Sequence, residues 1–284
     1  MTELSAEATS RTLTTAEGDL HYHDYGEGPP FLMLHGSGPG VSGWANFGDN
    51  LETFGRHFRC LVLDMPGFGI SYETDNAMLA APDAVIALLD GLGLDKVALL
   101  GNSMGGGIAA RVAAANPDRI SRLVTIGGVG VPFFSALPSE GITRLVEFVE
   151  DPTRDKIVAW MRSMVYDPAI LTDEFVDMRW QAAIEPAAME GIKKIYSREM
   201  LDILRTLMLD NTAMFSMLRQ IQAPTLITWG RDDRVTPLDG AIAPMRMIRK
   251  CELHVFHDCG HWSMLERKEE FESTVLAFLS RDLA

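Results

Sequence analysis

The chain has few cysteines, a deficit of positive charge and no apolar run long enough to span a membrane. Three cysteines in 284 residues are an odd number, which predicts a reduced, cytoplasmic protein without structural disulfides. Lysine and arginine total 25 against 39 acidic residues, so the formal net charge is −14. This balance argues against binding to nucleic acid or to an anionic membrane surface. No secretory signal or repeat is visible, and the histidine and cysteine spacings predict no metal site.

The length and the hydrophobic content of 47% predict one large α/β domain with an insertion. Strand and helix signals alternate through residue 128, which predicts a mostly parallel, doubly wound sheet. From residue 129 to about residue 214, helical periodicity dominates and no strong strand is expected. We therefore expect a core domain of residues 1–130 and 215–284, and a helical lid of residues 131–214 over the active site.

The most informative segment is the pentapeptide Gly101-Asn102-Ser103-Met104-Gly105. It follows an apolar run at 97–100 and precedes small helix-forming residues at 106–115. A strand, a tight turn and a helix are the setting of a nucleophile elbow, whose strained serine requires small neighbours. The serine oxygen then stands at the carboxyl edge of the sheet, above a helix N-terminus. The pentapeptide alone is weak evidence, because it arises by chance in about one chain in ten of this length.

A nucleophilic serine needs a base, and the base needs an orienting carboxylate. Two later predicted strands are followed by Asp233 and His261, at the sheet edge where ligands bind in α/β proteins. The chain order Ser, Asp, His is that of the α/β-hydrolases. We therefore predict a triad of Ser103, Asp233 and His261. Asp232 remains an alternative for the carboxylate, and His257 for the base.

A glycine-rich loop, His35 to Gly40, follows the predicted strand at 31–34. Glycines allow the backbone to approach a substrate closely, and a second backbone donor must face the elbow. We assign the oxyanion hole to the backbone N–H groups of Gly38 and Met104. His35 is expected to hold this loop rather than to act as a second base.

Taken together, these segments resemble the meta-cleavage product hydrolases, a family of α/β-hydrolases that cleave carbon–carbon bonds in bacterial aromatic and steroid degradation. The resemblance runs along most of the chain. The generic triad is shared with esterases and lipases, but further features are more selective in combination. The segments that carry the resemblance are His35–Gly40 with Gly43–Phe47, Gly101–Gly106, Met164–Asp167, Trp229–Arg234 and Cys259–Trp262.

The resemblance implies an anionic substrate, a vinylogous 1,5-diketone that carries a carboxylate and comes from the ring cleavage of a catechol. Arg179, on a predicted lid helix at 174–184, matches the arginine that binds this carboxylate in the family. The alternative is a surface arginine paired with Asp177 or Glu174.

The resemblance also implies roles for three more residues. Asn46 and Asn102 would hydrogen-bond to the oxygens of the dienoate, and Trp262 would pack beside them, although a plain core tryptophan is the alternative. The chain departs from the family pattern at 263–265 and in a short segment after Ser71. These departures leave open which substituent is accepted at the cleaved ketone.

The expected activity is hydrolysis of a carbon–carbon bond in a 2-hydroxy-6-oxo-hexa-2,4-dienoate, without a cofactor or a metal. A carboxylesterase, thioesterase or lactonase of the same fold is the alternative, and a non-catalytic ligand receptor is a third hypothesis. The resemblance further implies a homodimer or a larger homo-oligomer.

Overall fold

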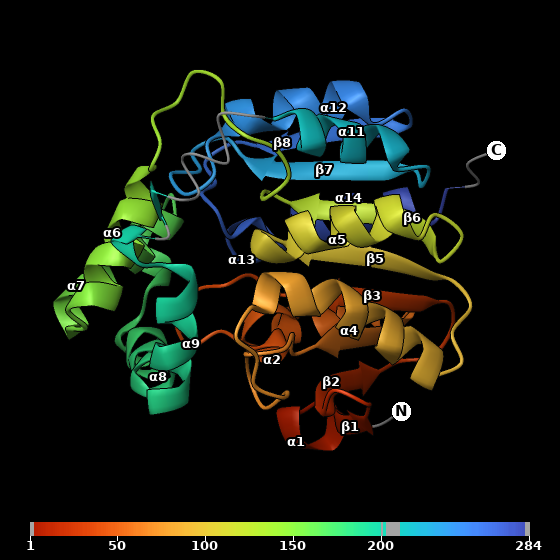
Figure 1. Ribbon diagram of the computed structural model, residues 1–284, viewed down its shortest axis with the longest axis horizontal. Coiled ribbons are helices and arrows are strands. Elements are labelled where there is room, and N and C mark those ends of the chain that lie inside the picture. Colours follow the sequence, from red (N-terminus) through yellow and green to blue (C-terminus); the bar gives the residue numbers. More distant parts are fainter. Residues whose placement is uncertain (1–2, 200, 203–210, 282–284) are drawn as a thin grey trace.

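The computed structural model describes residues 3–199, 201–202 and 211–281 and contains a central eight-stranded sheet. The strand order is β1-β2-β4-β3-β5-β6-β7-β8 (Figure 1). Strand β2 is antiparallel to both neighbours, whereas every pairing from β4 to β8 is parallel. The strands are β1 (Ser10–Thr14), β2 (Asp19–Tyr25), β3 (Pro30–Leu34), β4 (Arg59–Leu63), β5 (Val97–Asn102), β6 (Ile120–Ile126), β7 (Thr225–Gly230) and β8 (Cys251–Phe256).

Helices cover both faces of the sheet (Figure 1). One face packs against α4 (Ala77–Gly91), α5 (Met104–Ala115) and α11 (Thr212–Gln220), and the other against α3 (Leu51–Phe54) and α14 (Lys268–Leu279). The remaining short helices of the core are α1 (Ala6–Thr9), α2 (Gly43–Phe47), η1 (Gly48–Asn50), η3 (Leu238–Ala241), α12 (Ile242–Met247) and α13 (Ser263–Glu266).

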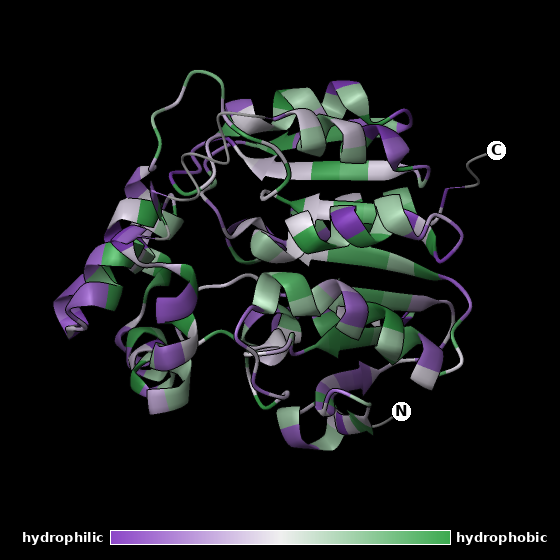
Figure 2. Ribbon diagram, viewed as in Figure 1, coloured by the Kyte–Doolittle hydropathy of each residue, from purple (hydrophilic) through white to green (hydrophobic). Residues whose placement is uncertain are grey.

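Strand β3 shows why both faces of the sheet are covered by helices. Phe31 and Met33 enter one hydrophobic cluster, and Leu32 and Leu34 enter the other, because successive side chains point to opposite faces. All four are fully buried, and hydrophobic residues dominate the central strands (Figure 2). The predicted doubly wound, mostly parallel α/β sheet is confirmed.

Between β6 and β7 the chain forms α6 (Glu140–Glu150), α7 (Arg154–Met164), η2 (Pro168–Ile170), α8 (Asp173–Ile184) and α9 (Pro186–Ile195). We call α6 to α9 the helical segment. It lies to one side of the sheet, away from both termini (Figure 1). Ser139, Thr153 and Thr172 cap α6, α7 and α8 by accepting a backbone N–H with their side chains. Residues 200 and 203–210 of the predicted lid lie outside the described residues. No described helix combines the length and the apolarity needed to cross a bilayer.

Candidate active site

Ser103 occupies the turn between β5 and α5 with φ 54° and ψ −118°. A non-glycine residue in such a conformation costs on the order of 1–3 kcal/mol, so the surrounding chain must hold it there. A Cβ on Gly101 would lie 2.1 Å from the Gly105 oxygen, and a Cβ on Gly105 would lie 2.4 Å from the His35 oxygen. The Ser103 N–H donates to the Ile126 oxygen at 2.8 Å, which ties the turn to β6. Glycine is therefore required on both sides of the serine.

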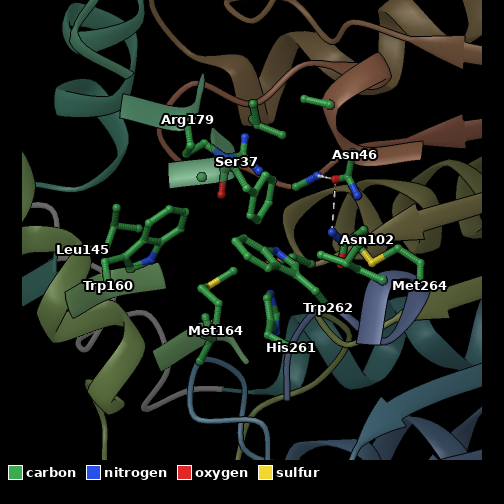
Figure 3. Close-up of a pocket in the computed structure, with 18 of the residues that line it drawn as sticks. Ser37, Asn46, Asn102, Leu145, Trp160, Met164, Arg179, His261, Trp262 and Met264 are labelled. Carbon is green, nitrogen blue, oxygen red and sulfur yellow. Dashed lines mark hydrogen bonds between the residues drawn. The ribbon is translucent and has the colours of Figure 1, made fainter. Parts of the chain in front are cut away.

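Ser103 opens onto a cavity of about 230 Å³ between the core and the helical segment (Figure 3). His261 and the predicted substrate-binding residues Asn46, Asn102, Arg179 and Trp262 all line this cavity. Other lining residues come from the loop after β3, from α13 and from the helical segment; they include Gly36, Ser37, Gly38, Met264, Leu265, Leu145, Trp160, Met164, Phe175, Met178 and Tyr196. The structure thus gathers side chains that lie far apart in the sequence.

Asp233 and His261 form a buried pair, with side chains 2% and 1% exposed. His261 Nδ1 donates to Asp233 Oδ2 at 2.7 Å, and Thr236 Oγ1 donates to the same oxygen at 2.8 Å. Asp233 Oδ1 accepts the backbone N–H groups of Val235 and Thr236 at 2.7 and 2.9 Å. Every neighbour of this carboxylate is a donor, so the imidazole proton sits on Nδ1 and Nε2 is left to accept a proton.

The two alternatives to this pair lie elsewhere. Asp232 forms an ion pair with Arg231 at 3.1 Å, and its side chain is one-third exposed. His257 is 61% exposed and contacts Asp258. His257 does not line the cavity, and the described hydrogen bonds of the His261 ring join it to Asp233 and Thr236 rather than to Asp232. The geometry therefore favours Asp233 and His261 over both.

The loop after β3 passes beside the elbow, because a Cβ on Gly36 would lie 3.4 Å from Ser103 Cβ. His35 Nδ1 donates to the Gly36 oxygen at 2.5 Å, and His35 Nε2 accepts the Met65 N–H at 3.0 Å. Burial lowers the pKa of His35, so the ring is neutral with both nitrogens engaged. These bonds hold the loop, and they leave Gly38 on the cavity wall.

Asn46 and Asn102 form an amide pair on the cavity wall (Figure 3). Asn46 Oδ1 accepts from the Gly36 N–H at 2.9 Å and from Asn102 Nδ2 at 3.1 Å. Among the described residues, Asn46 Nδ2 and Asn102 Oδ1 are buried without a hydrogen-bond partner. Buried polar atoms are normally paired, so one donor and one acceptor are available to a ligand here.

Arg179 brings an unneutralised positive charge into the cavity. Its side chain is buried, Nη1 donates to the Gly40 oxygen at 3.1 Å, and Cζ lies 5.6 Å from the Trp262 ring centroid. Nε has no hydrogen-bond partner among the described residues, and burial lowers the pKa of Arg179 to about 10. Asp177, the alternative partner, instead pairs with Arg154 at 2.6 Å. A buried cation without a described carboxylate partner is suited to binding an anion.

The structure also reveals residues that the sequence did not single out. Thr236 donates a hydrogen bond to the Asp233 carboxylate. Its position three residues after Asp233 is the sequence signal that could have indicated this role. Trp160 packs edge-to-face on Trp262 with ring centroids 6.0 Å apart. Tyr196 forms a hydrogen bond with Ser37 at 2.6 Å. Trp160 and Tyr196 carry no local motif, because only the packing of the helical segment brings them to the cavity.

The cysteines are buried or partly buried and unpaired. Burial raises the pKa of the Cys259 thiol well above its usual range, so this neighbour of His261 stays protonated and unreactive. All three cysteines are free. Within the described ranges, no group of three histidine, cysteine or acidic residues could hold a metal ion.

Comparisons with known proteins agree with this geometry. The sequence matches the family described as "alpha/beta hydrolase fold" over residues 29–268. It is 40% identical to a 2-hydroxy-6-oxononadienedioate/2-hydroxy-6-oxononatrienedioate hydrolase of Pseudomonas putida, over 98% of each chain. It is 34% identical to the 2-hydroxy-6-oxo-6-phenylhexa-2,4-dienoate hydrolase of Comamonas testosteroni, over 98% of this chain and 99% of the relative.

Among solved structures, the meta-cleavage product hydrolase of Pseudomonas fluorescens IP01 superimposes with a TM-score of 0.85 at 29% identity. The match covers 95% of this chain and 97% of that one. By sequence and by fold, the chain belongs to the α/β-hydrolase fold family and, within it, to the meta-cleavage product hydrolases.

Proposed function

We propose that the protein hydrolyses the carbon–carbon bond between C5 and C6 of a 2-hydroxy-6-oxo-hexa-2,4-dienoate. The observation that carries this proposal is Arg179, a buried cation that shares a cavity with Ser103 and His261 and has no described acidic partner. A simple ester substrate gives such a cation nothing to bind, whereas a dienoate carries a carboxylate. The relatives named above act on substrates of this class.

In the proposed complex, Arg179 binds the carboxylate through charge-assisted hydrogen bonds. The free donor of Asn46 and the free acceptor of Asn102 bind the oxygen on C2 and its proton. Trp262 packs along the conjugated chain. Ketonisation of the bound dienol transfers the C2 hydroxyl proton to C5 and gives a 2-oxo-3-enoate. C5 can then leave as the terminal carbon of a dienolate whose negative charge lies on the C2 oxygen.

Ser103 Oγ then attacks the C6 ketone while His261 Nε2 takes the serine proton, and Asp233 stabilises the resulting imidazolium. The tetrahedral oxyanion collapses and the C5–C6 bond breaks. The electron pair of this bond passes through the conjugated chain to the C2 oxygen. The C2 oxygen then takes a proton from His261, which re-forms the dienol. Water then attacks the acyl group on Ser103 with His261 again as base. The products are a 2-hydroxypenta-2,4-dienoate and a carboxylic acid.

The oxyanion is assigned to the backbone N–H groups of Gly38 and Met104. Met104 is the first residue of α5, so its N–H has no acceptor within the helix and lies at the positive end of the helix dipole. Gly38 lines the cavity on the loop beside Ser103. Two such donors aimed at a developing charge are the usual means of stabilising an acyl-transfer transition state.

We assign the helical segment the role of a lid on the core, within the boundaries 131–214 given by the sequence. It supplies Trp160, Phe175 and Arg179 to the cavity, and the Met164 oxygen accepts the His261 N–H at 2.6 Å. A closed lid excludes water from the reacting bond.

The substituent on C6 is proposed to be uncharged. Toward α6, α7 and the loop that follows β7, the cavity wall is formed by four apolar residues, Ile142, Leu145, Met164 and Val235. Arg179 is the one lysine or arginine among the described residues that line the cavity, and it serves the dienoate carboxylate. A second carboxylate, as in a dienedioate, would be buried there without a cation, which is costly.

Two assays test the proposal. The coloured 2-hydroxy-6-oxo-6-phenyl dienoate should lose its visible absorbance on incubation with the protein, at a steady rate over many turnovers. The competing substrate is a neutral 4-nitrophenyl ester. Faster cleavage of the ester than of the dienoate would make the protein an esterase, and stoichiometric binding of the dienoate without product would make it a receptor.

A further inference from the structure

The glycine-rich loop after β3 contacts the helical segment at three places, Ser37, Gly38 and Gly40. Ser37 bonds to Tyr196, which caps the C-terminus of α9. Trp160 of α7 lies against Gly38. Arg179 of α8 donates to the Gly40 oxygen. Each contact comes from a different helix, so the position of this loop depends on α7, α8 and α9 together.

The contact between Ser37 and Tyr196 is short and partly buried. The two hydroxyl oxygens are 2.6 Å apart, and Ser37 is 4% exposed. Burial raises the pKa of the Tyr196 phenol, so this group stays protonated at neutral pH. Either hydroxyl can donate in this pair, and we assign the donation to Tyr196 because a phenol is the stronger donor.

Among the described residues, the hydrogen bonds from the core to this loop extend as far as Gly36. His35 binds the Gly36 oxygen, and Asn46 accepts the Gly36 N–H, so both sides of this residue are fixed. Further along, the Gly38 oxygen accepts the Val41 N–H at 3.1 Å within the loop itself. The Gly38 N–H belongs to the peptide between Ser37 and Gly38. This peptide lies between the hydrogen bonds at Gly36 and the hydrogen bond to the Gly38 oxygen.

Two contacts with the helical segment restrain this peptide. A Cβ on Gly38 would lie 2.7 Å from Trp160 Cη2, so the indole ring rests directly on the glycine and blocks one direction of movement. The Tyr196 hydroxyl holds the side chain of Ser37 and limits rotation about its backbone. A hydrogen bond is directional, whereas a flat ring surface is not, so Tyr196 is the contact able to set the orientation of the peptide.

We propose that Tyr196 is a positioning residue, which acts through Ser37 to aim the backbone N–H of Gly38 at the developing oxyanion. This inference rests on the proposed role of Gly38 in catalysis. It makes the oxyanion hole a joint product of the core and the helical segment. An oxyanion hole assembled in this way reaches its full strength only when α9 is docked on the loop.

The test is a double-mutant cycle of Tyr196→Phe and Ser37→Ala, which remove the same hydrogen bond from its two ends. Deleting an oxyanion donor costs about 10²–10³-fold in kcat, and a donor that is loosened but present should cost less. Each variant is expected to lower kcat about tenfold on both a 4-nitrophenyl ester and the phenyl dienoate, with KM changed less than twofold. The double variant should be no slower than either single variant.

The matched control is Tyr166→Phe, because Tyr166 belongs to the same segment, is half-exposed and does not line the cavity. It should leave kcat unchanged. An unchanged kcat for Tyr196→Phe, a rise in KM alone, or losses that multiply to about a hundredfold in the double variant would each overturn the inference. A wild-type protein that cleaves only the ester would refute the carbon–carbon proposal, and the ester kcat would still decide the role of Tyr196.

Discussion

Replacing Arg179 tests the substrate class most directly. Burial lowers the pKa of Arg179 from 12.5 to about 10, which corresponds to roughly 3 kcal/mol of destabilisation of the charged form. A bound carboxylate can recover much of that energy, and charge-assisted hydrogen bonds contribute about 1.5–3 kcal/mol. Arg179→Met keeps an unbranched side chain, although a shorter one, and removes the charge. We expect kcat/KM for the dienoate to fall about tenfold to a hundredfold.

The same variant should hydrolyse a neutral 4-nitrophenyl ester within about threefold of the wild-type rate, since that substrate has no carboxylate. The melting temperature should not fall, because an unpaired buried charge is costly to keep and methionine fills much of the same space with apolar atoms. Arg179→Lys should retain part of the dienoate activity. Absorbance assays of both substrates, with a thermal melt of each variant, measure these effects.

Arg154→Ala is the matched control. Arg154 is a second arginine of the helical segment, it pairs with Asp177 of α8, and both side chains are about half exposed or more. Exposed ion pairs contribute about 0–1 kcal/mol, so this variant should change neither activity. Equal losses of dienoate and ester cleavage in Arg179→Met would refute the reasoning and make Arg179 a folding residue. No loss in either would place the carboxylate elsewhere.

Four further outcomes are expected. Ser103→Ala should retain less than about a hundredth of the turnover and still bind the dienoate in a spectroscopic titration; more activity would displace Ser103 as nucleophile. Asp233→Asn should lower kcat by about two to four orders of magnitude, because its amide NH₂ would face only donors, whereas Asp232→Asn should have little effect; the reverse ranking would move the role to Asp232. Burial lowers the pKa of His23 and of His35, so below the ordinary value of 6.5 the unfolded chain binds protons that the folded chain does not. Urea unfolding should therefore show stability falling by up to about 1.4 kcal/mol per pH unit for each histidine as the pH drops below 6.5, and a flat profile would contradict this. Dialysis against a chelator should leave activity unchanged, and activity lost there but restored by a divalent ion would reveal a metal.

Much of the fold was predictable because its signals are local. The apolar runs at β3, β4, β5 and β7 are strands buried on both faces, and each is readable from a few consecutive residues. The elbow is also local, since the steric limits on Gly101 and Gly105 arise within one turn and its immediate contacts. The family pattern added Asn46, Asn102 and Trp262, and the structure places all three on the cavity wall.

Other features depended on the tertiary structure. The sequence alone determined the order Ser, Asp, His and indicated the strands and helices around the elbow and the glycine-rich loop, because backbone sterics and side-chain alternation act between near neighbours. It could not distinguish a buried Arg179 from a surface arginine paired with Asp177, since that depends on how α8 packs against the core. The bond between Ser37 and Tyr196 joins residues 159 positions apart. Such contacts leave no periodic or local trace, because they form only when independently folded elements pack together and exclude water between them.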